Sequence, residues 1–143
     1  MSGATGAVIT RHDGSFLKAG GTWICSAANA LNMEAMALRD GVLLALQGNF
    51  SKVLMETDSV TLMKFWREDK DGRSDIGPLL LEVRERSKIF SEFDLRLVNR
   101  EANSAAHLCA HEVYSRKQRC LWLVTTPSFL LPCIEQDCNL MLS

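Results

Sequence analysis

Residues 52–66 have the sequence KVLMETDSVTLMKFW, and this stretch decides the fold class. Residues 52–56 form a short apolar run that predicts a strand, and residues 60–66 resume a helical spacing of apolar side chains. Asp58 therefore lies at the C-terminal end of a strand, where the next helix begins. In open α/β sheets this edge is where ligands bind.

Before this stretch, apolar residues recur at spacings of four, three, four and three, which predicts a helix. The residues concerned are Leu31, Ala35, Leu38, Val42 and Ala45. Asn29 or Asn32 is a suitable cap for its start, and Gly48-Asn49 is a suitable end.

The N-terminal part of the chain predicts an antiparallel meander with strands at residues 7–10, 15–19 and 22–25. His12-Asp13-Gly14-Ser15 is the expected turn, since Asp-Gly gives the backbone freedom that a tight hairpin needs.

The second half predicts a helix over 76–90, a strand over 93–98 and a helix over 102–114. The order of elements indicates a mixed α/β fold, with antiparallel strands first, parallel strands later, and helices on the sheet. We expect one domain over residues 1–115 and a C-terminal tail, 116–143, that packs on it or extends from it.

The bulk composition is that of a globular domain and gives no global signal of nucleic-acid binding. The chain has 143 residues, 47% hydrophobic and 23% charged, with a net charge of −1, whereas nucleic-acid-binding domains identified by charge are strongly basic. Between Arg96 and Arg119, however, five basic residues stand against two acidic ones. The simpler interpretation of this local excess is a solvated helix face, and the alternative is a phosphate-binding surface.

Five cysteines without a CxxC pair argue against a zinc site and favour free thiols in a reducing compartment. No secretory signal and no long apolar run is present in the sequence. We therefore expect an intracellular protein, nuclear or cytoplasmic, without a membrane segment.

Three residues are candidates for chemistry, and each also has a simpler interpretation. Glu34 borders the apolar stripe of its helix, although a glutamate early in a helix is also favoured by the macrodipole. Asp58 ends a strand, although it is also a good helix N-cap. His107 lies near the start of the last helix, where a histidine is more often a packed or capping side chain than a ligand.

Taken together and in this order, these features resemble the ribonuclease H superfamily. The resemblance is to type 1 domains of its plant, reverse-transcriptase-associated branch, and it covers nearly the whole chain. It rests on four motifs and on the tail: HDG at 12–14, MEAMAL at 33–38, TDS at 57–59, REANSAAHLCA at 100–110, and residues 122–137.

The resemblance implies hydrolysis of the RNA strand of an RNA–DNA hybrid by two Mg²⁺ ions, or Mn²⁺, held by four acidic side chains. It places Glu34 and Asp58 at two of the metal-binding positions and His107 at the fourth. The catalytic set is then Glu34, Asp58 and His107. Contacts to hybrid or RNA are expected from Arg100, Asn103, Arg116 and Lys117.

The chain also departs from the family pattern. Residues 1–6 resemble the loop before the family's second strand, so the first strand and its aspartate have no counterpart. We therefore expect an N-terminally truncated domain, with two of the four acids missing and little or no cleavage. Without that strand, the hairpin either pairs directly with residues 52–56 or leaves an unpaired edge.

Three functions remain open on the sequence. The first is an enzyme of ribonuclease H type, and the second is a module that binds nucleic acid without cutting it. The third is a non-functional remnant or a protein-interaction domain, whose partner surface would use the thiols and the apolar tail.

Overall fold

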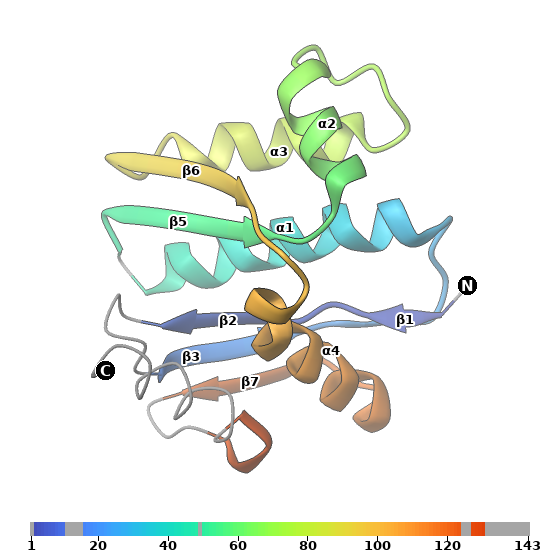
Figure 1. Cartoon of the computed structure of the whole chain (residues 1–143), viewed down its shortest axis with the longest axis vertical. Helices are drawn as coiled ribbons and strands as arrows, with labels where there is room; N and C mark the ends of the chain where they lie inside the picture. The colour runs from blue at the N-terminus through green and yellow to red at the C-terminus, as the bar shows by residue number, and fades with distance from the viewer. Residues whose placement is uncertain (1, 11–15, 49, 124–126, 131–143) are drawn as a thin grey trace.

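The computed structural model describes residues 2–10, 16–48, 50–123 and 127–130. These residues form the mixed α/β fold that the sequence predicts (Figure 1). The strands are β1 (Gly3–Ala4), β2 (Ala7–Thr10), β3 (Phe16–Gly21), β4 (Trp23–Ile24), β5 (Lys52–Thr57), β6 (Glu92–Leu97) and β7 (Cys120–Leu123). The helices are α1 (Ala30–Gln47), α2 (Val60–Glu68), α3 (Gly77–Ser87) and α4 (Ser104–Arg116), with 3-10 turns η1 (Glu101–Asn103) and η2 (Ser128–Leu130).

The described strands form three separate sheets rather than one continuous sheet. β2, β3 and β7 form an antiparallel sheet in that order, and β5 pairs with β6 in parallel, with Met55 opposite Leu95. The two short strands β1 and β4 pair with each other. The strand β7 belongs to the stretch that the sequence suggested as a tail, and it extends the sheet beyond β3.

The predicted meander is wrong at its third strand. β4 pairs with β1 instead of β3, because Thr5 and Thr22 join the two segments: the Thr5 amide donates to Thr22 O (3.0 Å) and the Thr22 amide to Thr5 Oγ1 (2.9 Å). The free side of β3 is then taken by β7. The predicted turn at residues 12–15 lies outside the described residues.

Helix α1 has the capping and the periodicity expected from the sequence. The Asn29 side chain accepts a hydrogen bond from the Asn32 amide at 2.8 Å, and Gly48 ends the helix. Its apolar stripe packs on α3 and on strands β2, β3 and β5. The larger core lies here and includes Leu38, Val42, Leu62, Leu80 and Leu95.

A second, smaller core lies on the other face of the antiparallel sheet, beneath α4. It contains Ala19, Cys109 and Leu130. Successive side chains of β2 point to opposite faces, so Val8 packs in this core and Ile9 in the larger one. The approach of α4 is so close that a Cβ on Gly6 would lie 2.4 Å from Ala106 O.

No ladder joins β2 to β5 within the part of the chain that the structure describes. Of the two outcomes expected for this region, direct pairing of the hairpin with β5 is therefore not the one found. Each of the two strands keeps one edge without a hydrogen-bonded strand among the residues that the structure describes.

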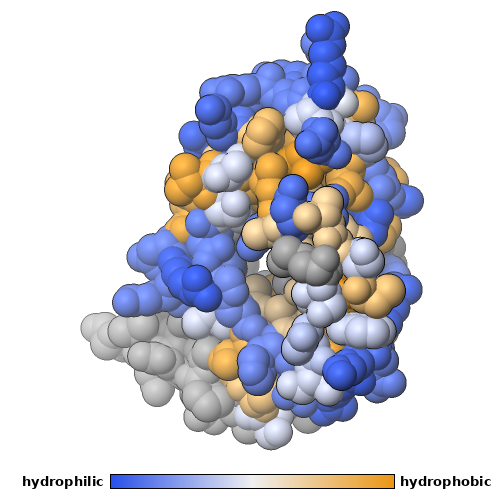
Figure 2. All heavy atoms as spheres, turned by 90° about the vertical axis from the view of Figure 1, so that its right-hand side faces the viewer, coloured by the Kyte–Doolittle hydropathy of each residue, from blue (hydrophilic) through white to orange (hydrophobic). Residues whose placement is uncertain are grey.

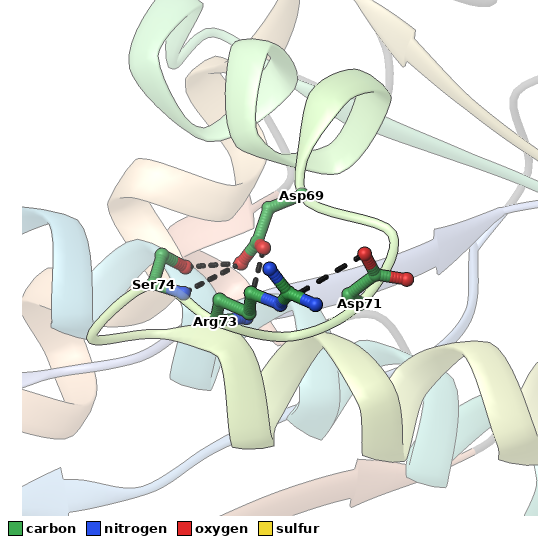
Figure 3. Close-up of polar contacts among 4 residues, drawn as sticks. All are labelled: Asp69, Asp71, Arg73 and Ser74. Carbon is green, nitrogen blue, oxygen red and sulfur yellow. Dashed lines mark hydrogen bonds and ion pairs between the residues drawn. The ribbon is translucent and has the colours of Figure 1, made fainter.

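The loop between α2 and α3 is held by Asp69 (Figure 3). Its carboxylate accepts from the backbone amides of Arg73 (2.9 Å) and Ser74 (3.0 Å) and from the Ser74 hydroxyl. These bonds stabilise the ionised form, with the Ser74 hydroxyl contributing most, and lower the pKa of Asp69. The loop is thus fixed by its own backbone, and Arg73 extends from it into solvent.

None of the described helices combines the length and apolarity that crossing a bilayer requires.

Candidate active site

A cavity of about 560 Å³ opens where β5 and β6 end and where α1, α2 and α4 begin. It lies toward the side of the molecule to which the arrowheads of β5 and β6 point in Figure 1. Figure 2 views the molecule from that side, and apolar patches alternate there with hydrophilic side chains. The cavity is lined by Ala30, Leu31, Glu34, Asp58, Ser59, Val60, Thr61, Leu97, Val98, Asn99, Arg100 and His107.

Asp58 follows β5 directly, and it is not the cap of the next helix. Ser59 takes that position, because its hydroxyl accepts from the Leu62 amide at 3.0 Å. Thr57 Oγ1 in turn accepts from the Ser59 amide at 3.1 Å, which fixes the exit from the strand. The Asp58 carboxylate is therefore free to face the cavity, and only 13% of its side chain is exposed.

His107, in the first turn of α4, is the partner of Asp58. Its Nε2 lies 2.7 Å from Asp58 Oδ2. An ionised carboxylate only accepts hydrogen bonds, so Nε2 is the donor when Asp58 is ionised. The bond orients the imidazole at the cavity wall.

Glu34, in the second turn of α1, completes the group of titratable side chains. Burial disfavours its charged form, and the negative charge of Asp58 adds to this, so the pKa of Glu34 is raised. The charges of His107 and Arg100 oppose the shift without cancelling it. A glutamate that holds its proton more tightly than usual thus lies near an aspartate that is bonded to imidazole.

Arg100 adds a cation to the lining of this cavity. It is exposed and precedes the η1 turn. Asn99 holds that turn, since its Oδ1 accepts from the Ala102 amide at 2.8 Å. A guanidinium is well suited to bind a phosphate.

The other predicted nucleic-acid contacts are not among the residues that line the cavity. Asn103 precedes α4 and makes no capping hydrogen bond with its side chain. Arg116 is nine residues beyond His107 on the same helix, about 13 Å along its axis. It pairs with Glu112 at 2.9 Å, and Lys117 follows as the left-handed cap. The structure thus brings Arg100 to the three titratable residues and leaves Arg116 and Lys117 at the opposite helix end.

The sequence did not predict the apolar wall of the cavity, formed by Leu31, Val60, Leu97 and Val98. Val60 is 68% exposed and Leu97 39% exposed. Only their positions in the sequence could have indicated these wall residues, because each lies within three residues of a polar candidate or of a strand end. Such a wall excludes water from one side of a bound ligand and strengthens polar contacts on the other.

The residues of the cavity do not fit a two-Mg²⁺ centre. Carboxylate oxygens are what Mg²⁺ prefers, but only Glu34 and Asp58 supply them here, and one Asp58 oxygen is bonded to His107. Among the described side chains, no three of His, Cys, Asp or Glu are gathered in a way that would hold a metal ion.

Residues 1–113 match the family model described as reverse transcriptase-like. The chain belongs to this family. A comparison of this reverse transcriptase-like chain with curated proteins finds no match.

Solved structures place the same fold in ribonucleases H. RNase H1 from the halophilic archaeon Halobacterium salinarum superposes with a TM-score of 0.72 at 25% identity, covering 80% of this chain and 87% of that one. The N-terminal RNase H domain of a Mycobacterium tuberculosis protein superposes with a TM-score of 0.58 at 14% identity, covering 80% and 93%. The ribonuclease H-like fold expected from the resemblance is therefore confirmed. Proteins of this fold generally use divalent metals.

Proposed function

We propose that this chain is a nucleic-acid-binding domain of ribonuclease H type, which binds RNA–DNA hybrid at the cavity and cleaves it weakly or not at all. The observation that carries the proposal is the cavity itself. It gathers Glu34, Asp58, His107 and Arg100 at the C-terminal edge of β5 and β6.

Family membership and the neighbouring RNase H1 support the choice of an RNA–DNA hybrid as ligand. The site adds its own support. Arg100 offers a guanidinium to a phosphate, and the apolar wall beside it offers a surface to a sugar. Binding of this kind depends on backbone shape and 2′-hydroxyl groups rather than on base sequence.

Weak cleavage follows from the donor set. Two carboxylates cannot balance the charge of two divalent ions, and one of them is bonded to an imidazole. Loss of a carboxylate from such a centre is expected to lower the rate by about 10³-fold, the scale of single catalytic deletions. Mg²⁺ and Mn²⁺ are the ions to test.

Binding is tested by fluorescence anisotropy with a labelled hybrid over a series of salt concentrations. We expect affinity to fall steeply with salt. Arg100→Ala should weaken binding and reduce the salt slope by about one. Arg73→Ala is the matched control, because Arg73 is an exposed arginine outside the cavity. Equal losses in the two variants would show that binding is not centred on the cavity.

Arg116→Ala asks a separate question in the same assay. Its guanidinium lies at the far end of α4 and pairs with Glu112. A loss comparable to that of Arg100→Ala would extend the nucleic-acid surface along the whole helix, whereas no loss would confine it to the cavity.

Cleavage is tested with the same hybrid in Mg²⁺ and in Mn²⁺, beside Glu34→Gln and His107→Asp. We expect little product from the parent and more from His107→Asp, which adds a carboxylate to the cavity. Strong cleavage by the parent that disappears in Glu34→Gln would refute the weak-activity part of the proposal. Salt-sensitive binding with no cleavage in either metal would make the chain a binding module.

A further inference from the structure

A second cavity lies between the C-terminal half of α1 and the start of β7. Its volume is about 140 Å³, which is below about 300 Å³, the lower end for sites that hold drug-sized ligands. The backbone of residues 20–22 and residues 119–121 complete its lining. Residues 119–121 lie beyond the stretch that matches the family model, and this cavity shares no lining residue with the first one.

The lining of this cavity contains one acidic and one basic residue that do not pair with each other. Asp40 is half-buried on α1, and Arg119 is exposed just before β7. Neither belongs to an ion pair within the part of the chain that the structure describes. The Asp40 carboxylate accepts from the Thr5 hydroxyl through Oδ2 alone, so its other oxygen remains available. A ligand that carries both a cation and an anion would complement these two residues.

The same cavity has an apolar side. Leu44 is 7% exposed and Leu121 is 52% exposed, and both belong to the lining. Gly20 lies between them, because a Cβ there would be 3.6 Å from Cδ1 of Leu44 and 3.5 Å from Cδ1 of Leu121. Since glycine has no side chain, space remains between the two leucines. An aliphatic group placed there would remove the exposed part of Leu121 from water, which is favourable.

We propose that this cavity binds a free α-amino acid with an aliphatic side chain, and leucine is the example to test. Its carboxylate pairs with the Arg119 guanidinium and its ammonium with the Asp40 carboxylate, and such charge-assisted hydrogen bonds are strong. Its side chain lies between Leu44 and Leu121. The inference does not depend on the proposed function, because the two cavities are separate.

Other small ligands complement the lining less well. A simple anion would meet Arg119 but would be repelled by Asp40. A divalent cation would find a single carboxylate among the described lining residues, whereas such ions prefer several oxygen ligands. A neutral apolar molecule would take both charged groups out of water without pairing them, which is costly. A zwitterion with an apolar side chain satisfies all three parts of the lining.

Binding is tested by NMR, in a titration of the whole isotope-labelled chain with L-leucine. We expect saturable shifts of backbone amides in residues 20–22, 40–47 and 119–121, and none near Asp58 or His107. Because three contacts of different chemistry fix the ligand, D-leucine should bind about tenfold more weakly or worse. N-acetyl-L-leucine lacks the ammonium and L-leucinamide lacks the carboxylate, and each should lose about tenfold or more, equivalent to about 1.4 kcal/mol.

Three outcomes of this titration overturn the proposal. The first is the lack of saturable shifts in these segments up to about 20 mM L-leucine. The second is equal affinity for the two enantiomers, which would show contact without a defined site. The third is equal affinity for L-leucine and L-leucinamide, which would assign the cavity to the N-terminus of a peptide.

Two variants with matched controls test the residues themselves. We expect Asp40→Asn and Arg119→Gln each to weaken L-leucine binding about tenfold or more. Asp71→Asn and Arg73→Gln remove an exposed acid and an exposed base that pair in the loop between α2 and α3, and they should leave binding within about twofold. Equal losses in variants and controls would overturn the proposal. If Asp40→Asn unfolds the chain through loss of the Thr5 hydrogen bond, the exposed Arg119→Gln decides.

Discussion

Asp58 and Ser59 are both good helix caps. Ser59 is the one that caps α2, and this leaves the Asp58 carboxylate available for chemistry. Ser59 accepts from the Leu62 amide, so the Asp58 carboxylate binds His107 instead. Burial raises the pKa of Glu34, the charge of Asp58 adds to this shift, and the charges of His107 and Arg100 oppose it. Single side chains at the end of one strand thus set the electrostatics of the cavity.

Glu34 is expected to cost stability at neutral pH. Its pKa in the folded chain is raised from its ordinary value of 4.5, so the folded state binds the proton more tightly than the unfolded state. The stability gained by binding this proton is complete below pH 4.5 and is lost as pH rises through the pKa of Glu34 in the folded chain. Glu34→Gln stays neutral, and we expect its free energy of unfolding to exceed that of the parent at about pH 7 and to match it at about pH 4.

Urea denaturation of parent and variant at the two pH values measures this. Glu68→Gln serves as the control, since Glu68 is an exposed glutamate at the end of α2. A Glu34→Gln variant that is less stable than the parent at neutral pH would show that the carboxylate stabilises the fold.

The thiol of Cys109 is expected to be inert in the folded chain. It is fully buried, and its Sγ donates to Gly20 O at 3.4 Å. Burial raises its pKa to about 12, so the reactive thiolate is rare at neutral pH. Brief treatment with iodoacetamide should modify the exposed Cys25 and leave Cys109 unmodified until urea is added. Mass spectrometry of the peptides distinguishes the two, and equal labelling without urea would contradict this account.

At the scale of elements, the cavity is built where a parallel strand pair ends and several helices begin. β5 and β6 run in the same direction, so the residues after both strands meet at one edge. α4 brings His107 to that edge from the other side of the antiparallel sheet. The start of each helix therefore matters more to the site than its length.

The cap of α2 gives a measurable case. Ser59→Ala removes the acceptor for the Leu62 amide, and we expect the free energy of unfolding to fall by about 1 kcal/mol. Ser59→Gly should lower the free energy of unfolding by only about a few tenths of a kcal/mol. Ser115→Ala, at an exposed position of α4, is the control and should change stability by less than about 0.5 kcal/mol. Equal losses at positions 59 and 115 would mean that the cap contributes little.

At the scale of the whole molecule, two cores of unequal size lie on the two faces of the antiparallel sheet. Among the described residues, the larger core has eleven buried side chains and the core beneath α4 has three. Buried apolar area is the main favourable term in folding. The elements that pack on the smaller core should therefore unfold locally at a lower free energy than global unfolding requires.

Native-state hydrogen exchange checks this directly. We expect amides of α4 and β7 to exchange through a partial opening, while those of α1, β5 and β6 exchange only on global unfolding. A Val42→Ala substitution in the larger core should lower the free energy of global unfolding by about 2 kcal/mol. It should leave the partial opening nearly unchanged. A single opening free energy for all amides would show that the two cores unfold together.

The local sequence predicted most of the elements, and it singled out the three titratable residues that line the cavity. The spacing of apolar residues predicted α1, with Asn29 as one of its two possible caps, and the strands β5 and β6 to within one residue. Local order along the chain was enough, because these features depend on neighbours within a turn of helix or a few residues of strand. The choice between Asp58 and Ser59 as cap stayed open, since both suit the position equally well.

Tertiary structure alone decided which distant segments meet. The pairing of β1 with β4 and the pairing of β3 with β7 both depend on contacts between residues far apart in the chain. The unpaired edges of β2 and β5 belong to the same class. Side-chain pattern indicates that a segment is a strand, but its partner is set by packing on both faces and by the free energy of the whole sheet.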